Sequence, residues 1–182
     1  EDFKDGRPHA IIGLVPGEII SEDAGYIDHI DVEYDILKVA VIERHKNTHH
    51  IGLGYIRGYG LKSGAVATSI SHDSHNIIVV GTSEEEMAAA ANRIVENHGG
   101  ITVMEKGKVL GEVTLAIAGI MSDDPLVMVN SALESAKDEA FRLGVSRDID
   151  PFMTLSFMAL PVIPTLRITT RGVFDVNTQR YI

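Results

Sequence analysis

Short apolar runs rich in Val, Ile and Leu recur along the chain, separated by Gly, Asn and Asp. Such runs are typical of β-strands, because β-branched side chains suit a pleated backbone while glycine and asparagine favour turns. The pattern predicts strands at residues 10–15, 36–43, 51–59, 64–70, 77–81, 101–105, 108–116 and 166–175. Strands precede the helices in bulk and then mix with them. We therefore expect an α+β fold with a mixed, largely antiparallel sheet.

One predicted strand is unusual because it contains Gly52, Gly54 and Gly58, with Gly60 close behind. A glycine-rich strand either lets another backbone approach closely or twists and carries bulges. We expect the twisted, bulged strand.

The first helix is predicted over residues 83–98. Ser83 and Glu86 match a capping box, acidic residues occupy the first turn, and Gly99 and Gly100 follow the helix. The predicted buried stripe consists of Met87, Ala91, Ile94 and Val95.

The second helix is predicted to begin after Asp123 and Asp124, with Pro125 in its first turn, and to continue to Gly144. We interpret the two aspartates as a helix cap rather than a catalytic pair. The predicted buried face consists of Leu126, Val129, Leu133, Ala136 and Ala140. A short third helix is expected within residues 151–160, where the sequence is apolar on nearly all sides and should be buried.

Charge and composition exclude several classes of protein. A formal net charge of -10 would repel nucleic acid and an anionic membrane alike. Apolar runs fall short of the roughly 18–20 residues that a membrane-spanning helix needs. The chain has no cysteine, so disulfides and thiolate metal sites are excluded, which is compatible with a reducing compartment. We expect a cytoplasmic protein.

Apolar content drops and acids accumulate in residues 22–35. We expect a boundary here, between an N-terminal strand segment or linker (1–34) and a main domain (35–182).

A dense polar junction between two predicted strands is the sequence SHDSHN, which contains Ser71, His72, Asp73, His75 and Asn76. These side chains could bind a divalent metal, form a proton-transfer network, or bond the backbone of their own turn. The turn accounts for the serines, the aspartate and the asparagine but not for the two histidines. A complete metal site is the weaker alternative, because three or four ligands are usual and no other histidine has a compelling spacing.

Other standard sites are absent from the sequence. It has no Walker loop, dinucleotide fingerprint, Gly-x-Ser-x-Gly elbow or His-Glu-x-x-His motif. The run RHKNTHH at residues 44–50 is interpreted as a solvated loop, with a peripheral metal contact as the alternative.

Five long blocks, in order, resemble the C-terminal region of bacterial and archaeal adenine deaminase, a branch of the amidohydrolase superfamily. They are DILKVAVIERH (35–45), GLGYIRGYGLKSGAVATSISHDSHNIIVVG (52–81), NRIVENHGG (92–100), LAIAGIMSD (115–123) and DPFMTLSFMALPVIPTLRIT (150–169). Residues 8–23 resemble the segment that leads out of that enzyme's barrel.

The resemblance implies part of a hydrolase that converts adenine and water to hypoxanthine and ammonia. In that family a two-metal centre of manganese or iron lies inside a (β/α)8 barrel. A barrel needs on the order of 200 residues of its own, and no His-x-His occurs in this chain. We therefore expect the metal ligands and the catalytic barrel to lie outside this chain, and the chain alone to bind no metal and to be inactive.

The resemblance places the SHDSHN loop (Ser71, His72, Asp73, His75, Asn76) where the domain meets the barrel, as an active-site or domain-interface loop. Two other functions remain open: a stand-alone purine-binding module, and an oligomerisation domain that uses apolar faces such as FMTLSFMAL. The expected partners are adenine, the missing barrel and further copies of the chain.

Overall fold

The computed structural model describes residues 6–182, so residues 1–5 of the predicted N-terminal segment lie outside the described residues. The strands are β1 (His9–Leu14), β2 (Ser21–Ile27), β3 (Ile36–Ile42), β4 (Ile51–Arg57), β5 (Ala65–Thr68), β6 (Ile77–Gly81), β7 (Gly100–Glu105), β8 (Lys108–Thr114), β9 (Leu166–Thr169), β10 (Gly172–Asp175) and β11 (Arg180–Tyr181). The helices are α1 (Glu84–Glu96), α2 (Leu126–Arg142) and α3 (Pro151–Met158).

The predicted α+β class is confirmed. An eight-stranded sheet has the order β2-β1-β4-β3-β6-β5-β7-β8, and β9, β10 and β11 form a smaller sheet. Only the pairing of β1 with β4 is parallel among the strand pairs of the described residues. None of the helices in this part of the chain is long and apolar enough to cross a membrane.

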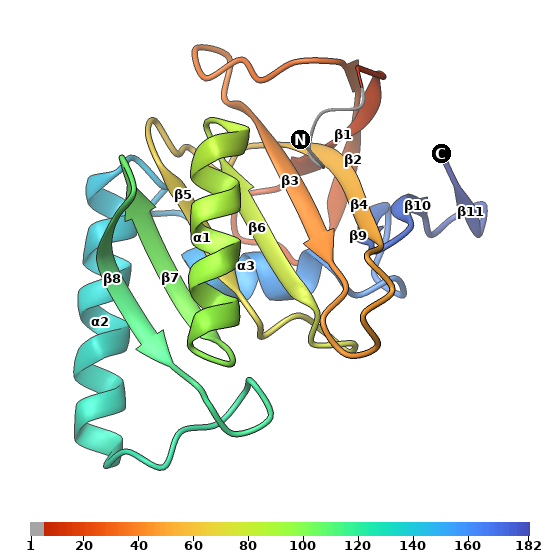
Figure 1. Cartoon of the computed structure of the whole chain (residues 1–182). Helices are drawn as coiled ribbons and strands as arrows, with labels where there is room; N and C mark the ends of the chain where they lie inside the picture. The colour runs from red at the N-terminus through yellow and green to blue at the C-terminus, as the bar shows by residue number, and fades with distance from the viewer. Residues whose placement is uncertain (1–5) are drawn as a thin grey trace.

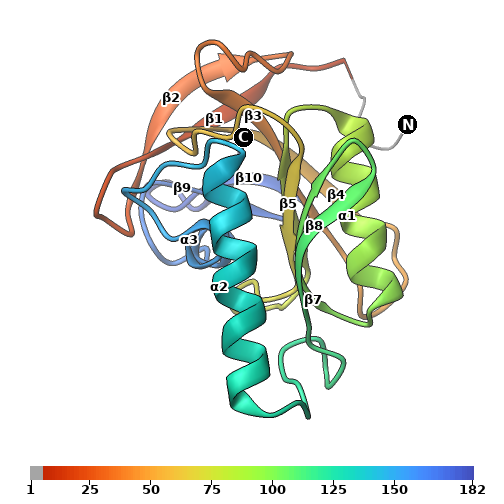
Figure 2. The ribbon, with the colours of Figure 1, turned by 90° about the vertical axis from the view of Figure 1, so that its left-hand side faces the viewer.

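Helices cover both faces of the large sheet (Figures 1 and 2). Helix α1 packs on β5, β6 and β7 on one face, while α2 lies on β8 and α3 lies on β5 on the other. Each face has its own apolar core. The larger core joins the sheet to α2, α3 and the β9–β10 hairpin, and the smaller core joins it to α1.

The Ser83 half of the predicted capping box of α1 is confirmed, but the Glu86 carboxylate accepts from the Lys106 N–H at 2.6 Å and its other oxygen is buried without a partner, so the reciprocal half is wrong. Ser83 is the N-cap, and its side chain accepts a hydrogen bond from the Glu86 backbone N–H at 3.2 Å.

The predicted stripe is wrong at one position: Val95 is 59% exposed, and Ala90 is buried in its place. Residues three and four apart share a helix face, so Ala90 lines up with Met87 and Ile94. Val95 follows the buried Ala91 by four residues, but it lies in the last turn of the helix, where it borders a pocket and stays exposed.

Two predictions for α2 are wrong. Pro125 is the N-cap residue and no side chain caps the helix, so Asp123 and Asp124 are not its cap. Leu126, predicted to be buried, is 83% exposed. The inner face rests on Ala136 and Ala140, with Val129, Leu133 and Ala132 packed against the core.

The apolar segment at α3 packs against the core of this same chain. Asp150 caps the helix by accepting hydrogen bonds from the N–H groups of Phe152 and Met153. The buried residues of the helix are Pro151, Phe152, Leu155, Ser156 and Met158. These residues are occupied within the domain, whereas Met153 is 42% exposed, and pairing of the segment with another copy stays a prediction.

Residues 166–175, predicted as one strand, form the β9–β10 hairpin. The hairpin lies against β4, where a Cβ on Gly52 would overlap the Thr169 carbonyl oxygen and crowd the Gly172 backbone nitrogen. A Cβ on Gly54 would press on Val173. The glycines of β4 therefore admit a second backbone, which corrects the expectation of a strand that is merely twisted.

The prediction did not include β2 and β11. Strand β2 lies in the acid-rich stretch that was read as a boundary and pairs antiparallel with β1. Ser21 ties it to β9, because its Oγ donates to the Leu166 carbonyl at 2.7 Å and accepts from the Leu166 N–H at 3.0 Å. The division at residue 34 stays a prediction.

Candidate functional site

One end of the large sheet gathers most of the chain's histidines. The strand registers place the loops 43–50, 69–76 and 97–99 and the segment 115–125 at this end. Six histidines lie here: His45, His49, His50, His72, His75 and His98. We call this the histidine-rich end, and it is the lower end of the sheet in Figure 1.

The 69–76 loop connects β5 to β6, as the sequence predicts. Helix α3 contacts this loop at His72. The His72 N–H donates to the Ser156 carbonyl at 3.1 Å. The His72 ring stacks on Phe157, with 5.5 Å between centroids and an interplanar angle of 19°. The hydroxyls of Ser71 and Ser156 are buried beside this contact without a hydrogen-bond partner. Helix α3 thus fixes the position of His72.

His72 remains half-exposed in spite of this packing. Its Nδ1 lies 3.4 Å from a carboxylate oxygen of Asp73, and 35% of the His72 side chain and 85% of the Asp73 side chain are exposed. The two side chains therefore present an imidazole and a carboxylate to whatever covers this end.

His75 is partly buried and closes the turn. Its backbone N–H donates to the Ser71 carbonyl at 2.6 Å, and its Nδ1 accepts from the Ser71 N–H at 3.4 Å. Burial lowers the pKa of His75, and the charges of His72 and Arg44 lower it further. An imidazole that accepts at Nδ1 and resists protonation is a structural acceptor here.

Arg44 joins three parts of the histidine-rich end, and sequence reasoning missed it. Its Nε donates to the His75 carbonyl at 2.5 Å, its Nη2 donates to the Ala118 carbonyl at 2.7 Å, and its backbone N–H donates to Asn76 Oδ1 at 3.2 Å. Burial lowers the pKa of the Arg44 guanidinium.

His45 continues the same contact, since its Nε2 donates to the Ser74 carbonyl at 2.7 Å. Residues 44 and 45 are therefore anchored to the 69–76 loop, whereas the sequence suggested that the whole run RHKNTHH was a solvated loop.

Two pockets lie at the histidine-rich end, and one of them borders the 69–76 loop. This one, of about 300 Å³, is bordered by Asp73, Ser74 and Asn76 on the loop side. The rest of its lining is mostly apolar and consists of Val41, Ala159, Leu160, Pro161, Val162 and Ile168, with Thr169 and Thr170. Its volume is at the lower limit of about 300 Å³ for small-molecule sites.

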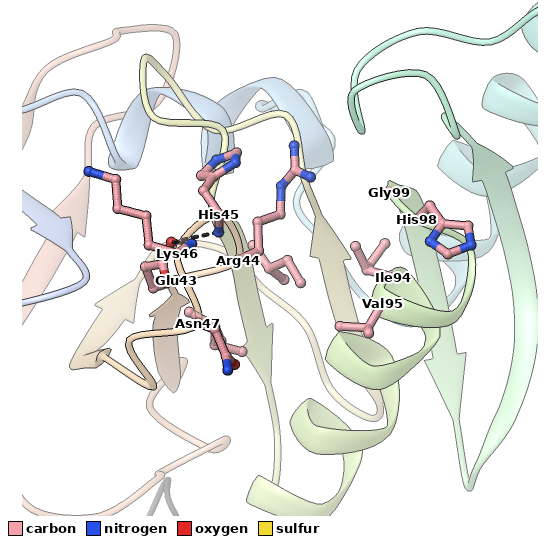
Figure 3. Close-up of a pocket in the computed structure, with 11 residues that line it drawn as sticks. Glu43, Arg44, His45, Lys46, Asn47, Ile94, Val95, His98 and Gly99 are labelled. Carbon is pink, nitrogen blue, oxygen red and sulfur yellow. Dashed lines mark hydrogen bonds between the residues drawn. The ribbon is translucent and has the colours of Figure 1, made fainter.

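The second pocket, of about 650 Å³, lies between the 43–50 loop and the end of α1 (Figure 3). Arg44 stands on one side of it, and Val95 and His98 stand on the other. The Glu43 carboxylate on its border is already occupied, because it accepts from the N–H groups of His45, Lys46 and Thr48. These bonds, Thr48 first, lower the pKa of Glu43 to about 2.

A bound metal ion would need several His, Cys, Asp or Glu side chains close together. Nowhere in residues 6–182 do three His, Cys, Asp or Glu side chains gather around a point where an ion could bind. The rings of His72 and His75 lie 5.8 Å apart between centroids, and with the neighbouring Asp73 they do not form a group that could hold an ion. The described residues therefore do not fit a two-metal centre.

Fold and site together define a class: an α+β domain whose polar loops, exposed imidazole and open pockets collect at one end of a mixed sheet. Residues 18–180 match the family model described as "Adenine deaminase C-terminal domain". The chain belongs to this family, as its resemblance in five blocks predicts.

Curated relatives extend well beyond the matched region. The chain is 46% identical over 178 residues to an adenine deaminase of Bacillus licheniformis, a match covering 94% of this chain and 31% of that protein. An adenine deaminase of Bacillus subtilis is 50% identical over 152 residues, covering 84% and 26%. One of Brucella anthropi is 47% identical over 184 residues, covering 97% and 32%. The chain thus spans about a quarter to a third of the length of these relatives.

Proposed function

We propose that this chain is the accessory C-terminal part of an enzyme that hydrolyses adenine to hypoxanthine and ammonia. The relatives that carry this domain are named adenine deaminases, and about two thirds of their length lies outside the match. The catalytic centre then lies on that remaining part, and the 182-residue chain alone does not turn over adenine. A cytoplasmic location and assembly into a homo-oligomer stay predictions from the sequence.

The family resemblance implies a two-metal centre of manganese or iron in the whole enzyme. Since the donor set described above does not fit one, the ligands belong to the proposed catalytic part, and we derive no step through the metal. What this chain contributes is a shaped, polar surface.

The 69–76 loop is the part of that surface that faces the substrate or the catalytic part. The observation that carries this proposal is the environment of His72. Its ring stacks on Phe157 and its backbone N–H bonds to Ser156, yet its side chain remains half-exposed beside Asp73. A pre-positioned imidazole next to a carboxylate can donate or accept one directed hydrogen bond without first losing side-chain entropy. His75, Asn76 and Ser71 hold the loop in shape.

The test separates the polar function of His72 from its packing. In the full-length polypeptide, His72→Phe keeps a flat ring against Phe157 but removes both nitrogens, whereas His72→Ala removes both the ring and the nitrogens. We expect kcat/KM for adenine to fall about tenfold or more in both variants, since one lost hydrogen bond of about 1.4 kcal/mol has that effect. The melting temperature should fall only in His72→Ala.

His29→Ala is the matched control, because His29 is an exposed imidazole beside Asp28 in the connection between β2 and β3. Its kinetics should equal those of the parent. Parent-like kcat/KM in His72→Phe, His72→Ala and His75→Ala would remove the 69–76 loop from the site.

A second function is favoured by the pocket beside the loop. Asp73, Ser74 and Asn76 offer donors and acceptors against a mostly apolar wall, which is the composition of a small-molecule site. A stand-alone purine-binding module would use this pocket without the catalytic part. Calorimetric titration of the 182-residue chain with adenine distinguishes the two, since no heat of binding is expected from an accessory domain.

A further inference from the structure

An exposed apolar surface lies beside the histidine-rich end. Five large apolar side chains within residues 117–128 are exposed: Ile117 (45%), Met121 (52%), Leu126 (83%), Val127 (74%) and Met128 (60%). We call these five residues the apolar patch. In Figure 2 the first turns of α2 and the segment before them project below the end of the sheet.

The domain's own fold does not use these side chains. The inner face of α2 is formed by Val129, Leu133, Ala136 and Ala140. Leu126, Val127 and Met128 are consecutive, so they point around the first turn instead of along that face. Single exposed apolar residues are ordinary, but a consecutive run beside two further ones is typical of an interface.

The patch continues along the outer side of α2 as a shallow hollow. The hollow has a volume of about 490 Å³ and is lined by Val127, Met128, Ser131, Ala132 and Ser135. Three of these side chains are small, so another backbone element can come close to the helix there.

Internal hydrogen bonds hold the segment before α2 in place. The Ile117 N–H donates to the Met121 carbonyl at 3.0 Å, and the Met121 N–H donates back to the Ile117 carbonyl at 3.1 Å. Ser69 Oγ donates to the Gly119 carbonyl at 2.5 Å. With the bond from Arg44 to Ala118, these contacts join the patch to the 69–76 loop.

We propose that the apolar patch and its hollow form the surface on which the catalytic part of the same polypeptide docks. The inference rests on the proposed function. Two observations select this occupant: the curated relatives carry about twice this chain's length beyond the match, and the patch is continuous with the loop assigned to the substrate side. Docking there would bury the patch and bring His72 and Asp73 against the active centre.

The absence of cysteine in this chain makes thiol footprinting a direct test. Val127→Cys and Ser135→Cys place a thiol in the hollow. Asn130→Cys is the matched control, because Asn130 is exposed on α2 but lies outside both the hollow and the inner face. The rate of modification by a water-soluble maleimide is measured for each variant in the 182-residue chain and in the full-length polypeptide, with the unsubstituted full-length polypeptide subtracted.

In the 182-residue chain all three thiols should react at similar rates. In the full-length polypeptide the thiols at 127 and 135 should react at least about tenfold more slowly, at every protein concentration, while the thiol at 130 keeps its rate. Equal rates in both polypeptides would overturn the proposal. Protection that disappears on dilution would also overturn it, because the occupant would then be a second copy.

Adenine turnover by the unsubstituted full-length polypeptide is measured separately. It reports on the proposed function alone, so a failure of the function and a failure of the docking surface remain distinguishable.

Discussion

Arg44 organises the histidine-rich end through a single side chain. Its partners, His75 and Ala118, lie 31 and 74 residues away in the sequence. A local sequence pattern does not indicate hydrogen bonds between residues so far apart in the chain. For this reason the sequence predicts that Arg44 belongs to a solvated loop. The cap of α1 was predictable because Ser83 and Glu86 are only three residues apart.

At the same scale, the lowered pKa of His75 predicts a pH dependence of stability. The folded chain keeps this imidazole neutral, mainly through burial, with His72, Arg44 and His45 acting in the same direction and Asp73 opposing them. The unfolded chain takes up the proton near the ordinary value of 6.5. The contribution of His75 is therefore complete above about pH 6.5 and is lost as the pH falls through its lowered pKa.

Urea unfolding of the 182-residue chain between pH 5 and pH 7.5 measures this contribution. The free energy of unfolding should decrease toward acid pH, and the decrease should be smaller in His75→Asn, because asparagine tolerates the positive φ of 49° at this position. His98→Asn, at a φ of 60°, controls for the substitution itself. Identical pH profiles for His75→Asn and the parent would refute the assignment.

At the scale of elements, the length and the apolar pattern of a segment decide whether its strand or helix can be predicted from the sequence. Strands β3 and β6 are buried runs and were predicted within a residue or two. Strand β2 was missed because it is an acid-rich edge strand in which only Ser21 is buried. The prediction for Leu126 was also wrong. Helical periodicity indicates which side of α2 faces the core, but it does not show that the first turn of the helix extends past the sheet (Figure 2).

The packing of the β9–β10 hairpin on β4 predicts a costly substitution. Gly52→Ala would place a methyl group against the backbone of Thr169 and Gly172. Overpacking against rigid backbone costs about 1–3 kcal/mol or more. Urea unfolding should therefore show a loss of at least this size.

Gly107→Ala is the control for this substitution. It meets no atom within 4 Å and has a φ of 71°. Gly107→Ala should lower the free energy of unfolding only through the left-handed backbone, by about 1–2 kcal/mol. If Gly52→Ala cost no more than Gly107→Ala, the hairpin would not be seated on β4 as described.

At the scale of the whole molecule, the fold class was predictable because strand and helix patterns are regular along the chain. The arrangement of the site was not, because the sheet brings together loops that are far apart in sequence. The residues expected in the SHDSHN loop do lie together, and the structure divides them into a half-exposed pair, His72 and Asp73, and a supporting set, Ser71, His75 and Asn76. Whether that loop serves the active site stays a prediction.

The central claim is that this domain assists catalysis performed by another part of the polypeptide. Conversion of adenine to hypoxanthine and ammonia, measured for the full-length polypeptide and for the 182-residue chain at equal molar concentration with manganese or iron supplied, tests it most directly. We predict turnover by the full-length polypeptide and none by the 182-residue chain. Turnover by the 182-residue chain, or none by the full-length polypeptide, would contradict the account.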